Sequence, residues 1–81
     1  MRLILVPSAI RQYYRLPKPE QKKVTRKLLA LEQNPLAGKK LSGELAGKWS
    51  LKAWPYRIIY VRKTPDEIWV IAILHRQGVY K

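Results

Sequence analysis

The segment Glu67–Arg76 is apolar on both of its alternating faces. Side chains alternate between two faces along a strand, and a strand that is apolar on both is buried from both sides. We therefore expect this segment to be a central strand of a sheet. Two further strand-like segments, Lys48–Trp54 and Tyr56–Lys63, precede it, and the connections between the three are short. Short connections favour antiparallel neighbours, so the three segments predict an antiparallel meander.

The N-terminal half predicts one strand and two helices. Arg2–Val6 is a short apolar run closed by a proline, which is typical of a strand. A first helix should follow and end before Pro17, and Pro19 can open a second helix that runs to Gln33. This second helix has one apolar stripe at helical spacing, made of Val24, Leu28 and Leu31. Residues 36–47 contain three glycines and are expected to form a loop.

The predicted order is therefore strand, helix, helix and three strands, in a single domain that spans residues 1–81. A chain of this length has room for one modest core. The apolar stripes of the helices must be buried against the sheet. We expect an α+β fold in which a two-helix hairpin packs on one face of the sheet and the opposite face is left as a working surface.

The charge is strongly unbalanced, because 17 Lys and Arg face five Asp and Glu, for a formal net charge of +12. Such a chain repels itself, and a polyanionic or acidic partner relieves the repulsion. Nucleic acid is the first candidate partner and an acidic protein is the second. A membrane surface ranks third, because the basic residues are spread along the whole chain. No stretch approaches the length of a membrane span, so a cytoplasmic protein is expected.

Strand alternation sorts the residues that could carry chemistry. In the first strand of the meander, one face carries Lys48, Ser50, Lys52 and Trp54, and the second, core-like face carries Trp49, Leu51 and Ala53. Arg57 and Arg76, on the next two strands, are expected to join Lys52 on one side of the sheet. Such a cluster of cations suits attack of an RNA 2′-OH on its own phosphate, because cations stabilise the charge that builds up in the transition state.

The sequence contains few residues suited to metal, thiol or nucleotide-binding sites. There are no cysteines, and His75 is the single histidine, so thiolate sites and sites built on two histidines are excluded. The five carboxylates lie mostly in turns and at helix ends, which makes a carboxylate metal site improbable. Neither a GxxxxGK nor a GxGxxG phosphate motif is present. We therefore expect neither a metal nor a cofactor.

Several short motifs together resemble the RelE/ParE toxin superfamily. They are Leu41-Ser42-Gly43, Gly47-Lys48-Trp49-Ser50-Leu51-Lys52, Tyr56-Arg57-Ile58-Ile59-Tyr60, Ile73-Leu74-His75-Arg76 and Val79-Tyr80. The helical hairpin that precedes them also fits, so the resemblance covers nearly the whole chain. It implies a toxin of a type II toxin-antitoxin system, with an acidic antitoxin as partner. The RelE-like members of the superfamily cleave mRNA on the ribosome.

The resemblance also implies roles for individual residues. In RelE-like nucleases, basic residues and a tyrosine at the corresponding positions contact the scissile phosphate and complete the site; here they are Lys52, Arg57, Arg76 and Tyr80. His75 is added because some relatives use a histidine at that position. RelE has a second lysine two residues before the one that matches Lys52, and this chain has Ser50 there. Lys48 lies on the same predicted face and is the candidate replacement.

Alternatives stay open for the function and for single residues. A non-enzymatic inhibitor of DNA gyrase, as in ParE, and a plain RNA-binding module share the expected fold. The basic face of the second helix, formed by Lys22, Lys23, Arg26 and Lys27, is either solvated or docks on ribosomal RNA. Lys48 and Lys52 could equally belong to a solvated strand face, and Arg57, His75 and Tyr80 could be structural. The retention of Lys52, Arg57, Arg76 and Tyr80 favours the nuclease.

Overall fold

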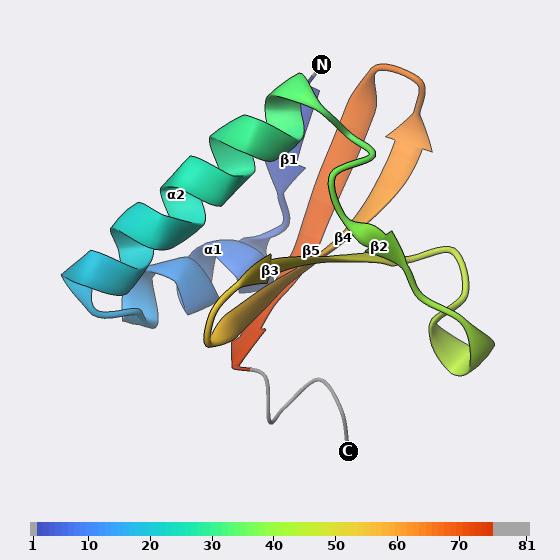
Figure 1. Cartoon of the computed structure of the whole chain (residues 1–81). Coiled ribbons are helices and arrows are strands. Elements are labelled where there is room, and N and C mark those ends of the chain that lie inside the picture. The colour runs from blue at the N-terminus through green and yellow to red at the C-terminus, as the bar shows by residue number, and fades with distance from the viewer. Residues whose placement is uncertain (1, 76–81) are drawn as a thin grey trace.

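The computed structural model describes residues 2–75 and contains five strands and two helices (Figure 1). In chain order these are β1 Arg2–Leu5, α1 Pro7–Arg15, α2 Lys18–Gln33, β2 Lys39–Lys40, β3 Trp49–Ala53, β4 Tyr56–Thr64 and β5 Glu67–His75, with a short 3-10 turn, η1, at Gly43–Leu45. The strands form one sheet in the order β1-β5-β4-β3-β2. The predicted α+β class and the meander of β3, β4 and β5 are confirmed.

The position of β5 in the sheet confirms the reading of its sequence. It lies between β4, to which it is antiparallel, and β1, to which it is parallel. The chain returns to this central strand through the helical hairpin, which is the longer connection that parallel neighbours need. The core buries Ile68, Val70 and Ile73 of β5, whereas the apolar side chains between them, such as Trp69 and Ile71, are half-buried.

The two helices cover one face of the sheet, as the sequence predicts (Figure 1). The predicted stripe of Val24, Leu28 and Leu31 is buried and belongs to the same core as Ala9 of α1. The sheet contributes the other half of this core from β3, β4 and β5, namely Leu51, Ala53, Ile58, Tyr60, Ile68, Val70 and Ile73. The hydrophobic core therefore lies between the helical layer and the three central strands.

The prediction of a loop over residues 36–47 was wrong at two places. Lys39 and Lys40 pair with Ser50 and Trp49 and add a fifth strand at the edge of the sheet, and η1 follows it. Two adjacent lysines carry no strand signal of their own. The edge of β3 supplies free backbone groups, and pairing with them overrides the local preference. Charged residues on a short edge strand are also a common protection against unwanted strand pairing.

Candidate nucleic-acid interface

Lys52 and Arg57 are direct partners across β3 and β4, next to the hairpin turn at Trp54 and Pro55. Residues that face each other in an antiparallel pair point to the same side of the sheet, with Cβ atoms about 4.5–5.5 Å apart. Lys52 is exposed and Arg57 is half-buried. Two like charges opposite each other destabilise a sheet, whereas a bound anion would turn the same pair into a favourable arrangement. The predicted proximity of these two residues is confirmed.

A small pocket of about 170 Å³ lies beside this pair. Its walls come from α2, the segment around β2, and the strands β3 and β4, and the lining residues are Lys27, Ala37, Gly38, Lys39, Ser50, Leu51, Lys52 and Arg57. Four of the eight are cations, and none is acidic. A pocket of this size is smaller than the roughly 300–1,000 Å³ of sites that hold a drug-sized molecule. Its size and charge suit a single anionic group such as a phosphate.

A second hollow of about 380 Å³ joins the basic helix to the same strand. It is lined by Lys23, Arg26, Lys27, Lys52, Ala53 and Trp54. Lys23 lines this hollow, and its Nζ donates to the Trp54 carbonyl oxygen at 3.2 Å and lies 3.3 Å from Glu20 Oε1. Lys27 and Lys52 line both hollows, so the two lie next to each other. The helix cations and the strand cations, which the sequence analysis treated as separate groups, form one surface.

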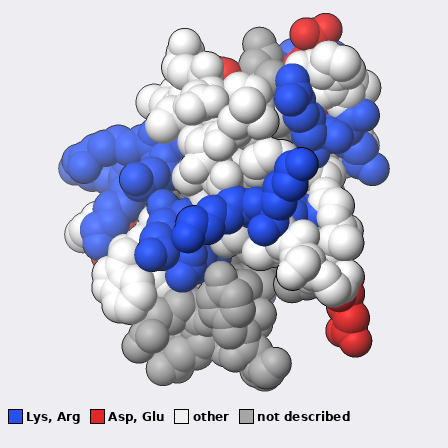
Figure 2. All heavy atoms as spheres, turned by 45° about the vertical axis from the view of Figure 1, so that its right-hand side comes forward, with Lys and Arg blue, Asp and Glu red and all other residues white. Residues whose placement is uncertain are grey.

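Figure 2 shows Lys and Arg side chains running as a band across one face of the molecule, with very few acidic side chains in view. Together with the two hollows, this band presents a strong positive field over a surface long enough to follow a nucleic-acid backbone. The residues that line the two hollows form the basic surface. A nucleic-acid backbone is a polyanion that binds such clusters of Lys and Arg.

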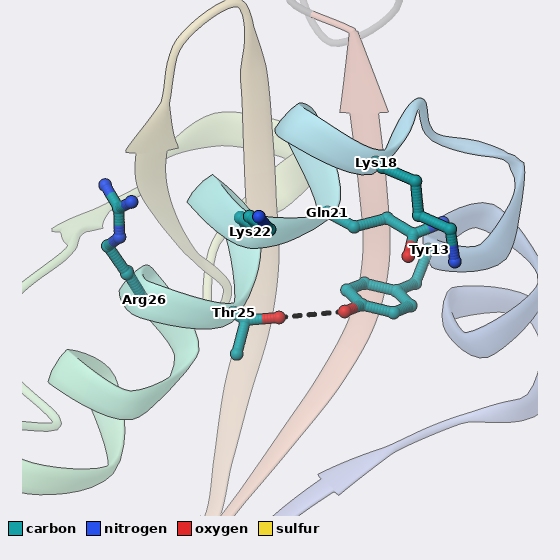
Figure 3. Close-up of a pocket in the computed structure, with 6 residues that line it drawn as sticks. All are labelled: Tyr13, Lys18, Gln21, Lys22, Thr25 and Arg26. Carbon is teal, nitrogen blue, oxygen red and sulfur yellow. Dashed lines mark hydrogen bonds between the residues drawn. The ribbon is translucent and has the colours of Figure 1, made fainter.

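Of the predicted docking residues on α2, Lys22 does not line the basic surface. Lys22 borders a groove of about 400 Å³ between α1 and α2, together with Tyr13, Lys18, Gln21, Thr25 and Arg26 (Figure 3). The Tyr13 hydroxyl and Thr25 Oγ1 are 2.8 Å apart and hold the two helices together at this groove. Arg26 borders both this groove and the basic surface. The four predicted docking residues are therefore divided between two sides of one helix.

His75 does not join Lys52 and Arg57. It pairs with Tyr56 across the sheet, one residue out of step with the pair formed by Arg57 and Leu74, so its ring lies on the opposite face. The His75 and Tyr56 rings meet edge to face with their centroids 5.5 Å apart. This geometry favours the structural alternative for the histidine. Arg76 and Tyr80, the other two residues expected at the site, lie outside the described residues.

Lys48 and Ser50 both differ from expectation. Lys48 is half-buried just before β3, its carbonyl oxygen accepts a hydrogen bond from Leu41 N at 2.9 Å, and it is not among the lining residues of the small pocket. Ser50 was expected on a solvated polar face, yet it is only 5% exposed. Ser50 has β2 on one side and β4 on the other, and these neighbours exclude water from it. No feature of the local sequence marks this burial.

The acidic residue Glu67 joins β5 to the neighbouring strand β1. Glu67 lies 3.5 Å from an Arg2 nitrogen and accepts a hydrogen bond from Trp69 Nε1 at 2.7 Å.

Across residues 2–75, no three His, Cys, Asp or Glu side chains come close enough to hold a metal ion together. The helices in this range are all too short or too polar to cross a membrane.

Comparisons with known proteins agree with this architecture. The family described as "ParE toxin of type II toxin-antitoxin system, parDE" matches residues 3–80. The toxin in the RelBE2 toxin-antitoxin complex from Mycobacterium tuberculosis is 27% identical, with a TM-score of 0.83 over 93% of this chain and 96% of that one. The YoeB/ParE toxin from Agrobacterium tumefaciens is 22% identical, with a TM-score of 0.75 over 93% and 98% of the two chains.

The isolated RelE toxin of Escherichia coli is 18% identical, with a TM-score of 0.74 over 91% of this chain and 82% of that one. None of the curated proteins matches the chain in sequence. The family match extends over almost the whole chain, and the solved relatives share its fold. The chain is therefore a toxin of the RelE/ParE superfamily of type II toxin-antitoxin systems.

Proposed function

We propose that this toxin is an endoribonuclease that cleaves mRNA on the ribosome. The observation that carries the proposal is the cationic pair Lys52 and Arg57 beside a phosphate-sized pocket at the centre of the basic surface. A gyrase inhibitor needs a binding face but no such pocket. The toxins named RelE and YoeB among the solved relatives have the same fold, which also supports the proposal.

The proposed reaction is attack of the ribose 2′-OH on the adjacent phosphorus. The new bond from the 2′-oxygen replaces the bond to the 5′-oxygen, which leaves with a proton, so the products are a 2′,3′-cyclic phosphate and a 5′-hydroxyl. Arg57 and Lys52 bind the phosphoryl oxygens and stabilise the negative charge that grows on them. Arg76 and Tyr80 are proposed to complete the site, Arg76 as a further phosphate ligand and Tyr80 by orienting the nucleotide or transferring a proton. The reaction uses no metal and no cofactor.

Docking on the ribosome is assigned to the helix α2. Lys22, Lys23 and Arg26 lie on two sides of this helix and can contact RNA backbone beyond the small pocket. Contacts of this kind release counterions from RNA and make binding steeply dependent on salt. These contacts hold the toxin on the ribosome without recognising an RNA sequence. The position of the mRNA on the ribosome would then determine where the toxin cuts.

An antitoxin partner and a cytoplasmic location follow from the same proposal. The toxins of the RelBE2 complex and of the YoeB-YefM complex from Staphylococcus aureus were each solved with an antitoxin. We expect this chain to have an acidic antitoxin, whose carboxylates meet the Lys and Arg of the basic surface while apolar side chains cover exposed groups such as Tyr14 and Leu29. Ribosomes and mRNA are reached in the cytoplasm, so the toxin should act there.

The second candidate function is inhibition of DNA gyrase without catalysis. It is favoured by one observation, that the matching family is the ParE toxin family. Induced expression distinguishes the two functions. Mapping of RNA ends should find new ends inside translated messages in phase with codons, while plasmid supercoiling stays normal. Supercoiling defects with intact mRNA would instead support the gyrase inhibitor.

A further inference from the structure

The wall of the small pocket contains a buried hydroxyl that the fold does not use. Ser50 is only 5% exposed, and its Oγ has no hydrogen-bond partner anywhere in residues 2–75. Placing a hydroxyl away from water without a partner is unfavourable, and proteins rarely retain such a group unless something else pairs with it. The residue lines a cationic pocket, so an anion bound there is the candidate partner for its hydroxyl.

Lys27 reaches the same pocket from the helical layer. It lies one turn before the buried Leu31 on α2, at the border between the apolar stripe and the solvated side of the helix. A lysine at such a border packs its aliphatic stem along the neighbouring strand and keeps its ammonium group in the polar space. Lys27 lines the pocket together with Ser50, Lys52 and Arg57, so a helix and two strands contribute to one site.

We infer that Lys27 and Ser50 bind the scissile phosphate together with Lys52 and Arg57. This inference rests on the proposed function and adds two ligands to it. Lys27 supplies a third positive charge to the phosphoryl oxygens, and the Ser50 hydroxyl donates a hydrogen bond to one of them. Both interactions strengthen as negative charge accumulates in the transition state, so both residues act on the chemical step as well as on binding. Lys27 thereby differs from Lys22, which lies outside the pocket.

Single-turnover cleavage of mRNA on programmed ribosomes, at saturating ribosome concentration, tests these roles. The variants are Lys27→Ala and Ser50→Ala, with Lys27→Arg to restore the charge. Arg11→Ala is the matched control, because it also removes one positive charge from an exposed helical position and lies in neither hollow. We expect Lys27→Ala and Ser50→Ala each to cut about tenfold more slowly or worse, Lys27→Arg to recover most of the rate, and the control to match the wild type.

A phosphate titration gives a readout that does not depend on cleavage. Inorganic phosphate is added to the folded toxin while the amide resonances of Gly38 and Ser50 are followed by NMR. We expect these amides to shift in the wild type and in Arg11→Ala, and the apparent Kd to rise at least about fivefold in Lys27→Ala and Ser50→Ala, since each loses one ligand of the anion.

The outcomes separate the inference from the proposed function. A wild-type toxin that cleaves mRNA, with Lys27→Ala and Ser50→Ala cutting at the same rate, overturns the inference and leaves the proposed function standing. Equal phosphate affinity in all the variants also overturns it. A folded wild-type toxin that binds phosphate at this pocket but never cuts RNA contradicts the proposed function itself, and with it the assignment of the bound anion as a scissile phosphate.

Discussion

Replacement of Gly38 by alanine should destabilise the protein far more than such a small change usually does. The Gly38 backbone N–H donates to the Tyr60 hydroxyl at 3.1 Å, and that hydroxyl donates to the Pro35 carbonyl oxygen at 3.2 Å. A Cβ on residue 38 would press on the Tyr60 hydroxyl, and would lie 2.9 Å from both Tyr60 Cε1 and the Ser50 carbonyl oxygen. Tyr60 is fully buried in the core, so it has no free space into which to move.

The magnitude follows from these contacts. Overpacking of a filled core costs about 1–3 kcal/mol of unfolding free energy. If Tyr60 gives way, its two hydrogen bonds are lost as well, at about 1 kcal/mol each. The total of about 3–5 kcal/mol is a large part of the roughly 5–15 kcal/mol that holds a small domain together. For a domain of this size, each kcal/mol corresponds to about 4–8 °C, so Tm should fall by at least about 10 °C.

Urea unfolding followed by tryptophan fluorescence measures this loss, with Gly43→Ala as the control. This control also replaces a glycine by alanine, but no atom lies within 4 Å of the added Cβ. Only the positive φ of 65° at Gly43 disfavours a side chain there. Such a left-handed position costs about 1–2 kcal/mol. The reasoning is refuted if Gly38→Ala unfolds at the same urea concentration as Gly43→Ala, because steric contact with Tyr60 would then have no effect.

Three further predictions address single groups. Burial raises the pKa of Tyr60 above its ordinary 10.0, against a smaller lowering by the Gly38 hydrogen bond. Its contribution to stability is therefore complete below pH 10 and lost as pH rises through the raised pKa, so the wild type should lose stability above pH 10 faster than Tyr60→Phe, and parallel curves would contradict this. Ser50→Ala should raise the unfolding free energy by about 1 kcal/mol, since it removes an unpaired buried hydroxyl, and a clear loss of stability in urea unfolding would refute this. Cleavage should survive chelation of divalent ions other than the magnesium that keeps ribosomes intact, and a strict need for another ion bound by the isolated toxin would disprove metal independence.

The sequence predicts those parts of the fold in which apolar residues recur at a regular spacing. The spacing of Val24, Leu28 and Leu31 repeats one rule over successive turns, and the structure buries this stripe as expected. The doubly apolar run of β5 correctly predicts a strand inside the sheet, although only Ile68, Val70 and Ile73 of this strand are buried. β2 has no such period, because Lys39 and Lys40 become a strand only through the edge of β3. Pairings of this kind depend on residues distant in sequence, which local patterns do not contain.

The candidate site also has a part that the sequence predicts and a part that it does not. The proximity of Lys52 and Arg57 follows from strand alternation and a short hairpin, and is confirmed. The approach of Lys27 to this pair depends on how α2 crosses the sheet, and the burial of Ser50 depends on β2, so neither was predicted. The sequence motif places His75 beside Arg76, but strand alternation puts the His75 side chain on the opposite face of the sheet from Arg57.

The most direct test of the account is single-turnover cleavage of ribosome-bound mRNA by Lys52→Ala and Arg57→Ala, after circular dichroism and urea unfolding have shown that both variants are folded. Both residues act on the phosphate in the transition state, so saturation with ribosomes should not restore the rate, and each variant should cut on the order of a hundredfold more slowly than the wild type. A folded Arg57→Ala toxin that cuts at the wild-type rate, or that stays toxic through gyrase while mRNA remains intact, would contradict the account.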